Sequence, residues 1–189
     1  MILDFKELLD IVIMTVVVGY IFTGIFNRFA HDRYQTGFDW KSFKFSCLVT
    51  APAIILHELG HKFVALGFGL GATFHAAYVW LGIGTVLRAL NTGFIFFVPA
   101  YVQIECATPL CTNVAPIKLS AIAAAGPAVN LAIFFLCWAI LQKKDLKKNT
   151  RLIVYITKQI NLFLFIFNML PIPAFDGFKV YQGLWKTFF

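Results

Sequence analysis

The sequence predicts an all-α membrane protein: a polytopic transmembrane helix bundle with a small β-strand element. The first observation is composition, since 60% of the 189 residues are hydrophobic, 17% are aromatic and only 13% are charged. Soluble domains carry about 25% charged residues, so a water-soluble globule, a disordered chain and a nucleic-acid-binding protein are all disfavoured. The second observation is a series of long apolar runs. The third is that basic residues cluster between these runs, where lipid headgroups would lie.

Four apolar runs are long enough to cross a membrane, because about 20 helical residues span a hydrocarbon core of about 30 Å. They lie at about 8–26, 43–66, 119–141 and 152–170. Much of the basic charge falls in the loops 27–42 and 142–151. We expect one domain over residues 1–189, with a leading helix at about 8–26 and a core at about 43–180.

The segment 67–118 is less regular than the rest of the chain. Residues 73–78 follow three glycines and can form a short strand, and residues 100–105 alternate like a strand. Between them, residues 79–98 are apolar enough for a helix. A single crossing by 79–98 would put the polar motifs described below on opposite faces. We therefore expect 79–98 to be re-entrant, surface-lying or part of a paired crossing.

Most of the nine acidic residues occupy chain ends or polar loops, and this group includes Glu7 and Asp10 near the N-terminus. Only Glu58 and Asp176 lie in or beside a spanning run, among apolar neighbours. Carboxylates in a membrane are energetically costly and usually functional.

The second run contains His57-Glu58-Leu59-Gly60-His61, an HExxH pattern. Spacing of four residues puts both imidazoles on one helix face, where they can bind one zinc ion per chain. Glu58 stands beside them, where it can accept a proton from a water molecule. Packing alone would not require two histidines and a glutamate in a membrane helix.

Two histidines leave the metal one protein ligand short. His31 lies in a polar loop and His75 in a glycine-rich stretch, where a packing or interfacial role is more usual. Asp176 is the better candidate, because Pro171 and Pro173 end the preceding helix and Gly177 permits a sharp turn. Asp176 can also serve as the N-cap of a last helix, which does not exclude ligation.

Asn130 and Asn168 are the other notable polar residues of the apolar runs. Asn130 belongs to Ala125-Gly126-Pro127-Ala128-Val129-Asn130, and Asn168 precedes Pro171 by three residues. Each amide needs hydrogen-bond partners. We expect these two asparagines to bind the backbone of an extended substrate or to orient the metal site.

Together these motifs resemble the site-2 protease family of intramembrane zinc metalloproteases. HExxH, Gly-Pro-x-x-Asn and Asn-x-x-Pro-x-x-x-x-Asp-Gly occur here in the family's order, over about 45–180. The resemblance implies His57, His61 and Asp176 as zinc ligands and Glu58 as general base. It also implies cleavage within or near a transmembrane segment of a substrate protein, in regulated intramembrane proteolysis. Residues 100–105 resemble the strand thought to present that substrate, without the glycine pair often found there.

These features predict a multi-pass protein of the cell membrane whose partners are lipid and a transmembrane substrate, with no nucleic acid. Its orientation has conflicting indications. The basic loops place their own side in the cytoplasm by the positive-inside rule, whereas the resemblance places the metal site nearer the cytosol. We follow the resemblance.

Two alternatives remain open at the sequence level. One is another membrane HExxH peptidase, such as a prenyl-protein peptidase, whose third ligand is a downstream glutamate; here only Glu105 follows Glu58. The other is a non-enzymatic metal sensor or carrier that uses the same ligands.

Overall fold

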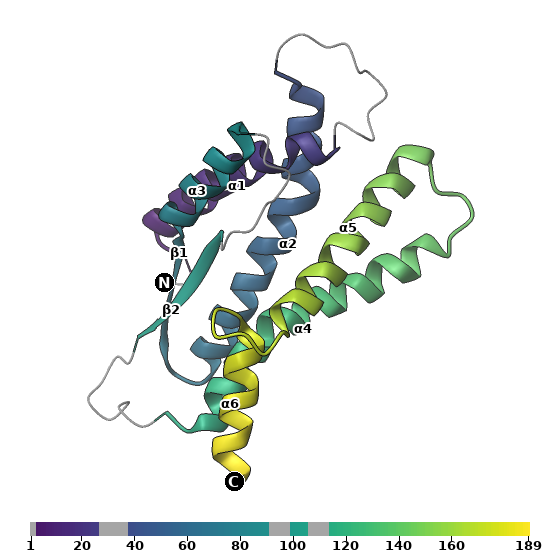
Figure 1. The fold of residues 1–189 in the computed structure, drawn as a ribbon. Coiled ribbons are helices and arrows are strands. Elements are labelled where there is room, and N and C mark those ends of the chain that lie inside the picture. The colour runs from purple at the N-terminus through teal and green to yellow at the C-terminus, as the bar shows by residue number, and fades with distance from the viewer. Residues whose placement is uncertain (1–2, 27–37, 91–98, 106–113) are drawn as a thin grey trace. The chain divides into compact units, whose positions relative to one another are not determined.

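The computed structural model describes residues 3–26, 38–90, 99–105 and 114–189, which form helices and one two-stranded sheet (Figure 1). The elements are α1 (Phe5–Phe26), α2 (Trp40–Gly67), β1 (Gly71–Ala76), α3 (Tyr78–Ala89), β2 (Ala100–Glu105), α4 (Pro116–Leu141), α5 (Lys148–Asn168) and α6 (Asp176–Phe188). The mostly helical class and the small β element are therefore confirmed. Two compact units are described separately below: residues 1–55 with 74–101, and residues 56–73 with 102–189. The single domain remains a prediction.

Three described helices, α2, α4 and α5, are long and apolar enough to cross a membrane, with 28, 26 and 21 residues. They correspond to the second, third and fourth predicted spans. Helix α1 forms where the first span was predicted, but it is not among these three. The count of four spans therefore stays a prediction.

Helix α3 occupies the first part of the region where an extra or re-entrant helix was predicted. It has 12 residues, which corresponds to about 18 Å at 1.5 Å per residue. That length is too short to cross a hydrocarbon core of about 30 Å. Residues 91–98 lie outside the described part of the chain, so the re-entrant path stays a prediction.

In the first unit, α1 packs against α3 and buries Met14, Val18 and Ile21. Glu7 and Asp10 were expected at a polar chain end, and this expectation was wrong, because their side chains are buried, with only 3% and 1% exposed. Their carboxylates accept hydrogen bonds from backbone N–H groups of β1. Glu7 accepts from Phe74 at 2.6 Å, and Asp10 accepts from Ala76 at 3.2 Å. The acids lie inside the fold because they satisfy an otherwise unpaired strand edge.

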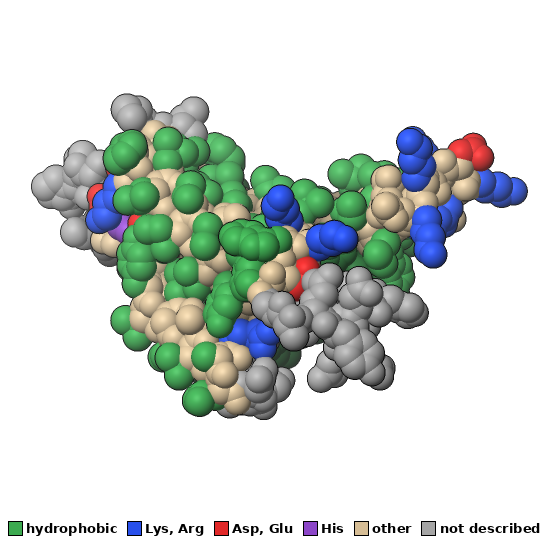
Figure 2. Space-filling view, turned by 90° about the horizontal axis from the view of Figure 1, so that it is seen from above, with side chains coloured by type: hydrophobic (Ala, Val, Ile, Leu, Met, Phe, Trp, Pro, Cys, Tyr) green, Lys and Arg blue, Asp and Glu red, His purple; other side chains and the backbone are tan. Residues whose placement is uncertain are grey.

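In the second unit, α4 packs against both α5 and α6. Ser120 of α4 donates a hydrogen bond to the Val180 carbonyl of α6. A Cβ on Gly183 would come within 2.1 Å of the Ser120 hydroxyl, so this crossing needs a glycine. Helices α4 and α5 form a hairpin joined at residues 142–147, and Figure 2 shows basic side chains at that end, beyond mostly hydrophobic ones.

Candidate metal centre

Helix α2 carries the two histidines on one face. Their rings lie one turn apart, with centroids 4.8 Å from each other. Gly60, between them in sequence, faces α4, where a Cβ would lie 3.0 Å from the Ala125 carbonyl oxygen. The small residue lets α4 approach the helix that bears the histidines.

Asp176 lies near the two histidines although it comes much later in the sequence, at the start of α6. Helix α5 ends at Asn168, and α6 begins at Asp176 after a turn that contains both prolines. Gly177 makes this turn possible, because a Cβ there would lie 2.5 Å from the Met169 carbonyl oxygen. The N-cap of α6 is Phe175. Asp176 is therefore the first helical residue, and not the N-cap considered above.

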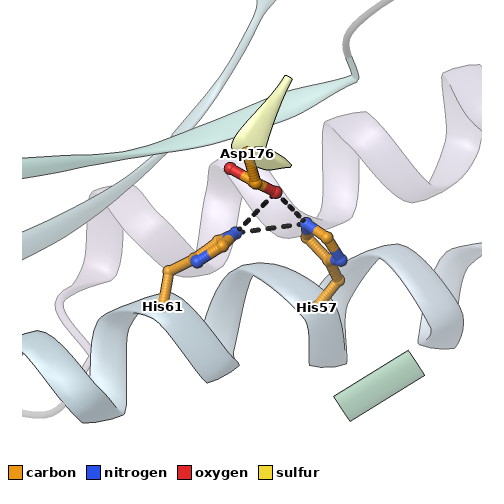
Figure 3. A group of neighbouring side chains, drawn as sticks. All are labelled: His57, His61 and Asp176. Atoms are coloured by element: carbon orange, nitrogen blue, oxygen red, sulfur yellow. Dashed lines mark hydrogen bonds and ion pairs between the residues drawn. The ribbon is translucent and has the colours of Figure 1, made fainter. Parts of the chain in front are cut away.

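The three side chains converge on one point (Figure 3). Asp176 Oδ2 lies 3.0 Å from His57 Nε2 and 3.2 Å from His61 Nε2, and the two nitrogens lie 3.1 Å apart. One carboxylate oxygen of Asp176 therefore faces both imidazole nitrogens at a distance from which all three atoms can share one cation.

The other ring nitrogens determine what the histidines offer to this point. His61 Nδ1 lies 2.7 Å from the Ile122 carbonyl oxygen, which can only accept, so Nδ1 carries the hydrogen. The Gly126 N–H is farther from this nitrogen, at 3.4 Å. His57 Nδ1 faces Oδ1 of Asn130 in the same way. In its neutral form, each ring directs the lone pair of Nε2 toward Asp176.

The donor set fits a zinc ion. Tetrahedral ligands at zinc bond lengths of 2.0–2.1 Å are about 3.3 Å apart, close to the 3.0–3.2 Å separations found here. Gly126 keeps the adjacent space open, since a Cβ would lie 2.4 Å from His61 Nε2 and 2.7 Å from His57 Nε2. Three protein ligands leave a fourth position for water or substrate.

The other candidate residues are distributed unequally. Glu58 is buried on α2 beside His57 but is not in the converging group. Asn130 contacts His57, whereas the Asn168 amide donates to Leu164 of its own helix. His75 lies in the first unit against Tyr101. His31 lies outside the described residues.

Asn161 of α5, which is fully buried, was not predicted from the sequence as part of the site. Its Oδ1 accepts a hydrogen bond from Asn130 Nδ2 at 2.9 Å. The available signal was the one used for Asn130, an amide within an apolar run. The hydrogen bond between His61 and the Ile122 carbonyl could not be predicted, because a backbone group leaves no pattern in the sequence.

The sequence profile described as Peptidase family M50 matches residues 139–189, which include Asp176. A protein of Methanocaldococcus jannaschii named "putative zinc metalloprotease" is 32% identical over 186 residues, covering 97% of this chain and 86% of its own length. A Synechocystis protein of the same descriptive name is 25% identical over 148 residues, covering 78% of this chain and 33% of its own length. No solved structure matches.

Proposed function

This chain belongs to the site-2 protease family, peptidase family M50, and we propose that it is an intramembrane zinc endopeptidase. It hydrolyses peptide bonds within or near transmembrane segments of other membrane proteins, as in regulated intramembrane proteolysis. The names of the two relatives support the zinc-protease assignment. The proposed location is the cell membrane, with α2, α4 and α5 as spans.

One observation carries the proposal: three electron-pair donors point at one another in a buried place. Two imidazole nitrogens and a carboxylate oxygen lie 3.0–3.2 Å apart, and the hydrogen on each ring is committed to the far side. When both rings are neutral, these three atoms are all acceptors, and a bound cation satisfies them together. The His₂-carboxylate set is that of catalytic zinc sites.

The proposed ligands are His57, His61 and Asp176, and the proposed general base is Glu58. When bound, zinc supplies Lewis acidity that polarises the scissile carbonyl. Glu58 accepts a proton from the attacking water molecule while the water oxygen forms a bond to the carbonyl carbon. The same carboxyl then delivers that proton to the leaving amine nitrogen as the C–N bond breaks.

The sheet supports an extended substrate. A helical peptide bond is protected by its own hydrogen bonds, so the substrate must be unwound before hydrolysis. Glu7 and Asp10 accept hydrogen bonds from N–H groups of β1, so we propose that the other strand, β2, pairs with the substrate. Much of β2 is exposed, and strand addition is an established mode of peptide recognition.

The position of the acids argues against the prenyl-peptidase alternative. Glu105, the glutamate that alternative requires, is exposed at the end of β2. The third converging ligand atom belongs to Asp176. The sensor or carrier alternative uses the same ligands. It differs from the protease in needing no general base, so a variant of Glu58 distinguishes the two.

The test is Glu58→Gln in proteoliposomes that contain a fluorescently quenched single-span reporter with a glycine-rich centre. We expect both proteins to retain about one zinc per chain. Cleavage should fall by several orders of magnitude, since general-base assistance alone contributes about 10²–10⁴ and no other proton acceptor is proposed. Equal cleavage by both proteins would contradict the mechanism. Zinc in both with no wild-type cleavage would favour a sensor or carrier.

A further inference from the structure

A chain of hydrogen bonds runs from the backbone of α5 to the metal centre, and its starting point has a fixed polarity. Asn161 Nδ2 donates to the Thr157 carbonyl oxygen at 2.8 Å. A carbonyl oxygen can only accept, so the NH₂ group of Asn161 must face Thr157. Its Oδ1 therefore faces the opposite way, toward α4.

The fixed polarity is passed to α4. Asn161 Oδ1 lies 2.9 Å from Asn130 Nδ2 and can only accept, so the NH₂ group of Asn130 must point at Asn161. Asn130 Oδ1 is then directed at His57 Nδ1. Both asparagines are 0% exposed. Solvent therefore does not substitute for either partner.

We propose that Asn161 is a positioning residue for the metal centre, because it holds the Asn130 amide in the one orientation that directs the His57 Nε2 lone pair at the metal. The inference rests on the proposed function and adds a residue to it. With the Asn130 amide reversed, an NH₂ group would face His57 Nδ1 and favour hydrogen on Nε2. That tautomer cannot bind a metal through Nε2.

The two histidines differ in how securely they are oriented. His61 donates to a backbone carbonyl, that of Ile122, which cannot reverse its polarity. His57 donates to a side-chain amide, whose oxygen and nitrogen can exchange places by rotation. His57 is therefore the ligand that needs a further residue, and Asn161 is the residue in contact with that amide.

The experiment compares three variants of the full chain in detergent. Asn161→Leu removes both hydrogen bonds and keeps the branched shape of the side chain. Asn161→Asp preserves the polarity in its protonated form, because the carboxyl O–H donates to the Thr157 carbonyl and the other oxygen accepts from Asn130. Gln159→Leu is the matched control, since it removes an exposed amide from the same helix.

The readouts are zinc affinity, measured by chelator competition, and the visible absorption spectrum of the Co²⁺-substituted protein. We expect Asn161→Leu to weaken zinc binding about 10-fold, at the lower end of the effect of removing a group that supports a metal ligand, and to change the Co²⁺ spectrum. Asn161→Asp and Gln159→Leu should both retain wild-type affinity and spectrum.

If Asn161→Leu does not fold, Asn161→Ser replaces it. Its hydroxyl can bond to the Thr157 carbonyl of its own helix but is too short to reach Asn130, so the same loss of affinity is expected. Wild-type zinc affinity and Co²⁺ spectrum in the removal variant would overturn the inference, as would equal losses in Asn161→Asp. These outcomes leave the proposed function intact. Absence of zinc binding by the wild type would instead overturn the proposed function.

Discussion

Each of the two compact units buries acidic side chains, and the groups facing those acids differ. In the first unit, Glu7 and Asp10 meet backbone N–H groups of β1. In the second, Asp176 meets two imidazole nitrogens whose hydrogens point elsewhere. The first arrangement is complete without a further group, because donors meet acceptors. The second brings together three atoms that can ligate one cation.

This difference shows that burial of a carboxylate is weak evidence for a metal site. Glu7 is as deeply buried as the histidines, yet one of its oxygens accepts the Phe74 N–H and the other the Asp4 N–H. The informative property is the hydrogen-bonding character of the neighbours. Variants of the acids of α1 should therefore leave zinc binding unchanged, although they lower stability.

The largest expected effect follows removal of both histidines. The double variant His57→Ala, His61→Ala leaves Asp176 as the last of the converging ligands. Zinc content should fall from about one ion per chain to none, as measured by elemental analysis of the purified protein. Unchanged stoichiometry would place the metal elsewhere.

Asp176→Ala should have the next largest effect. It removes the proposed oxygen ligand but leaves both imidazoles, so zinc should bind more weakly and reporter cleavage should be abolished. The control is His75→Ala, because His75 lies beside Tyr101 in the other unit and should affect neither quantity. Full activity in Asp176→Ala, or metal loss in His75→Ala, would assign the third ligand to another residue.

A smaller effect is expected at the acids of α1. Glu7→Ala would leave the buried Phe74 N–H without its carboxylate acceptor, so the free energy of unfolding should fall by about 1–3 kcal/mol. Denaturant titration in detergent measures this change, with the exposed loop variant Asp145→Ala as the control. The zinc content of Glu7→Ala should equal that of the wild type; loss of zinc without loss of stability would contradict the comparison.

The sequence could predict those features that depend only on residues close together in the chain. The spacing of His57 and His61 places both on one face of any helix, so their convergence needed no knowledge of the fold. Apolar length located α2, α4 and α5 for the same reason. Pro171, Pro173 and Gly177 likewise marked the break that frees Asp176 from α5.

Contacts between distant segments could not be predicted in this way. Glu7 is 67 residues from Phe74, and Asn130 is 31 residues from Asn161. The acids of α1 were misjudged because their partners in β1 and α3 lie more than 60 residues away in the sequence and include backbone N–H groups, which leave no side-chain pattern. Asn161 was missed because an isolated amide in an apolar run does not indicate which helix it faces.

The most direct test of the central claim is X-ray absorption at the zinc edge of the purified wild-type protein. The account predicts only nitrogen and oxygen neighbours at about 2.0–2.2 Å, including two imidazoles. Sulfur at about 2.3 Å, the distance of a thiolate ligand, would contradict it. So would a first shell that contains no imidazole.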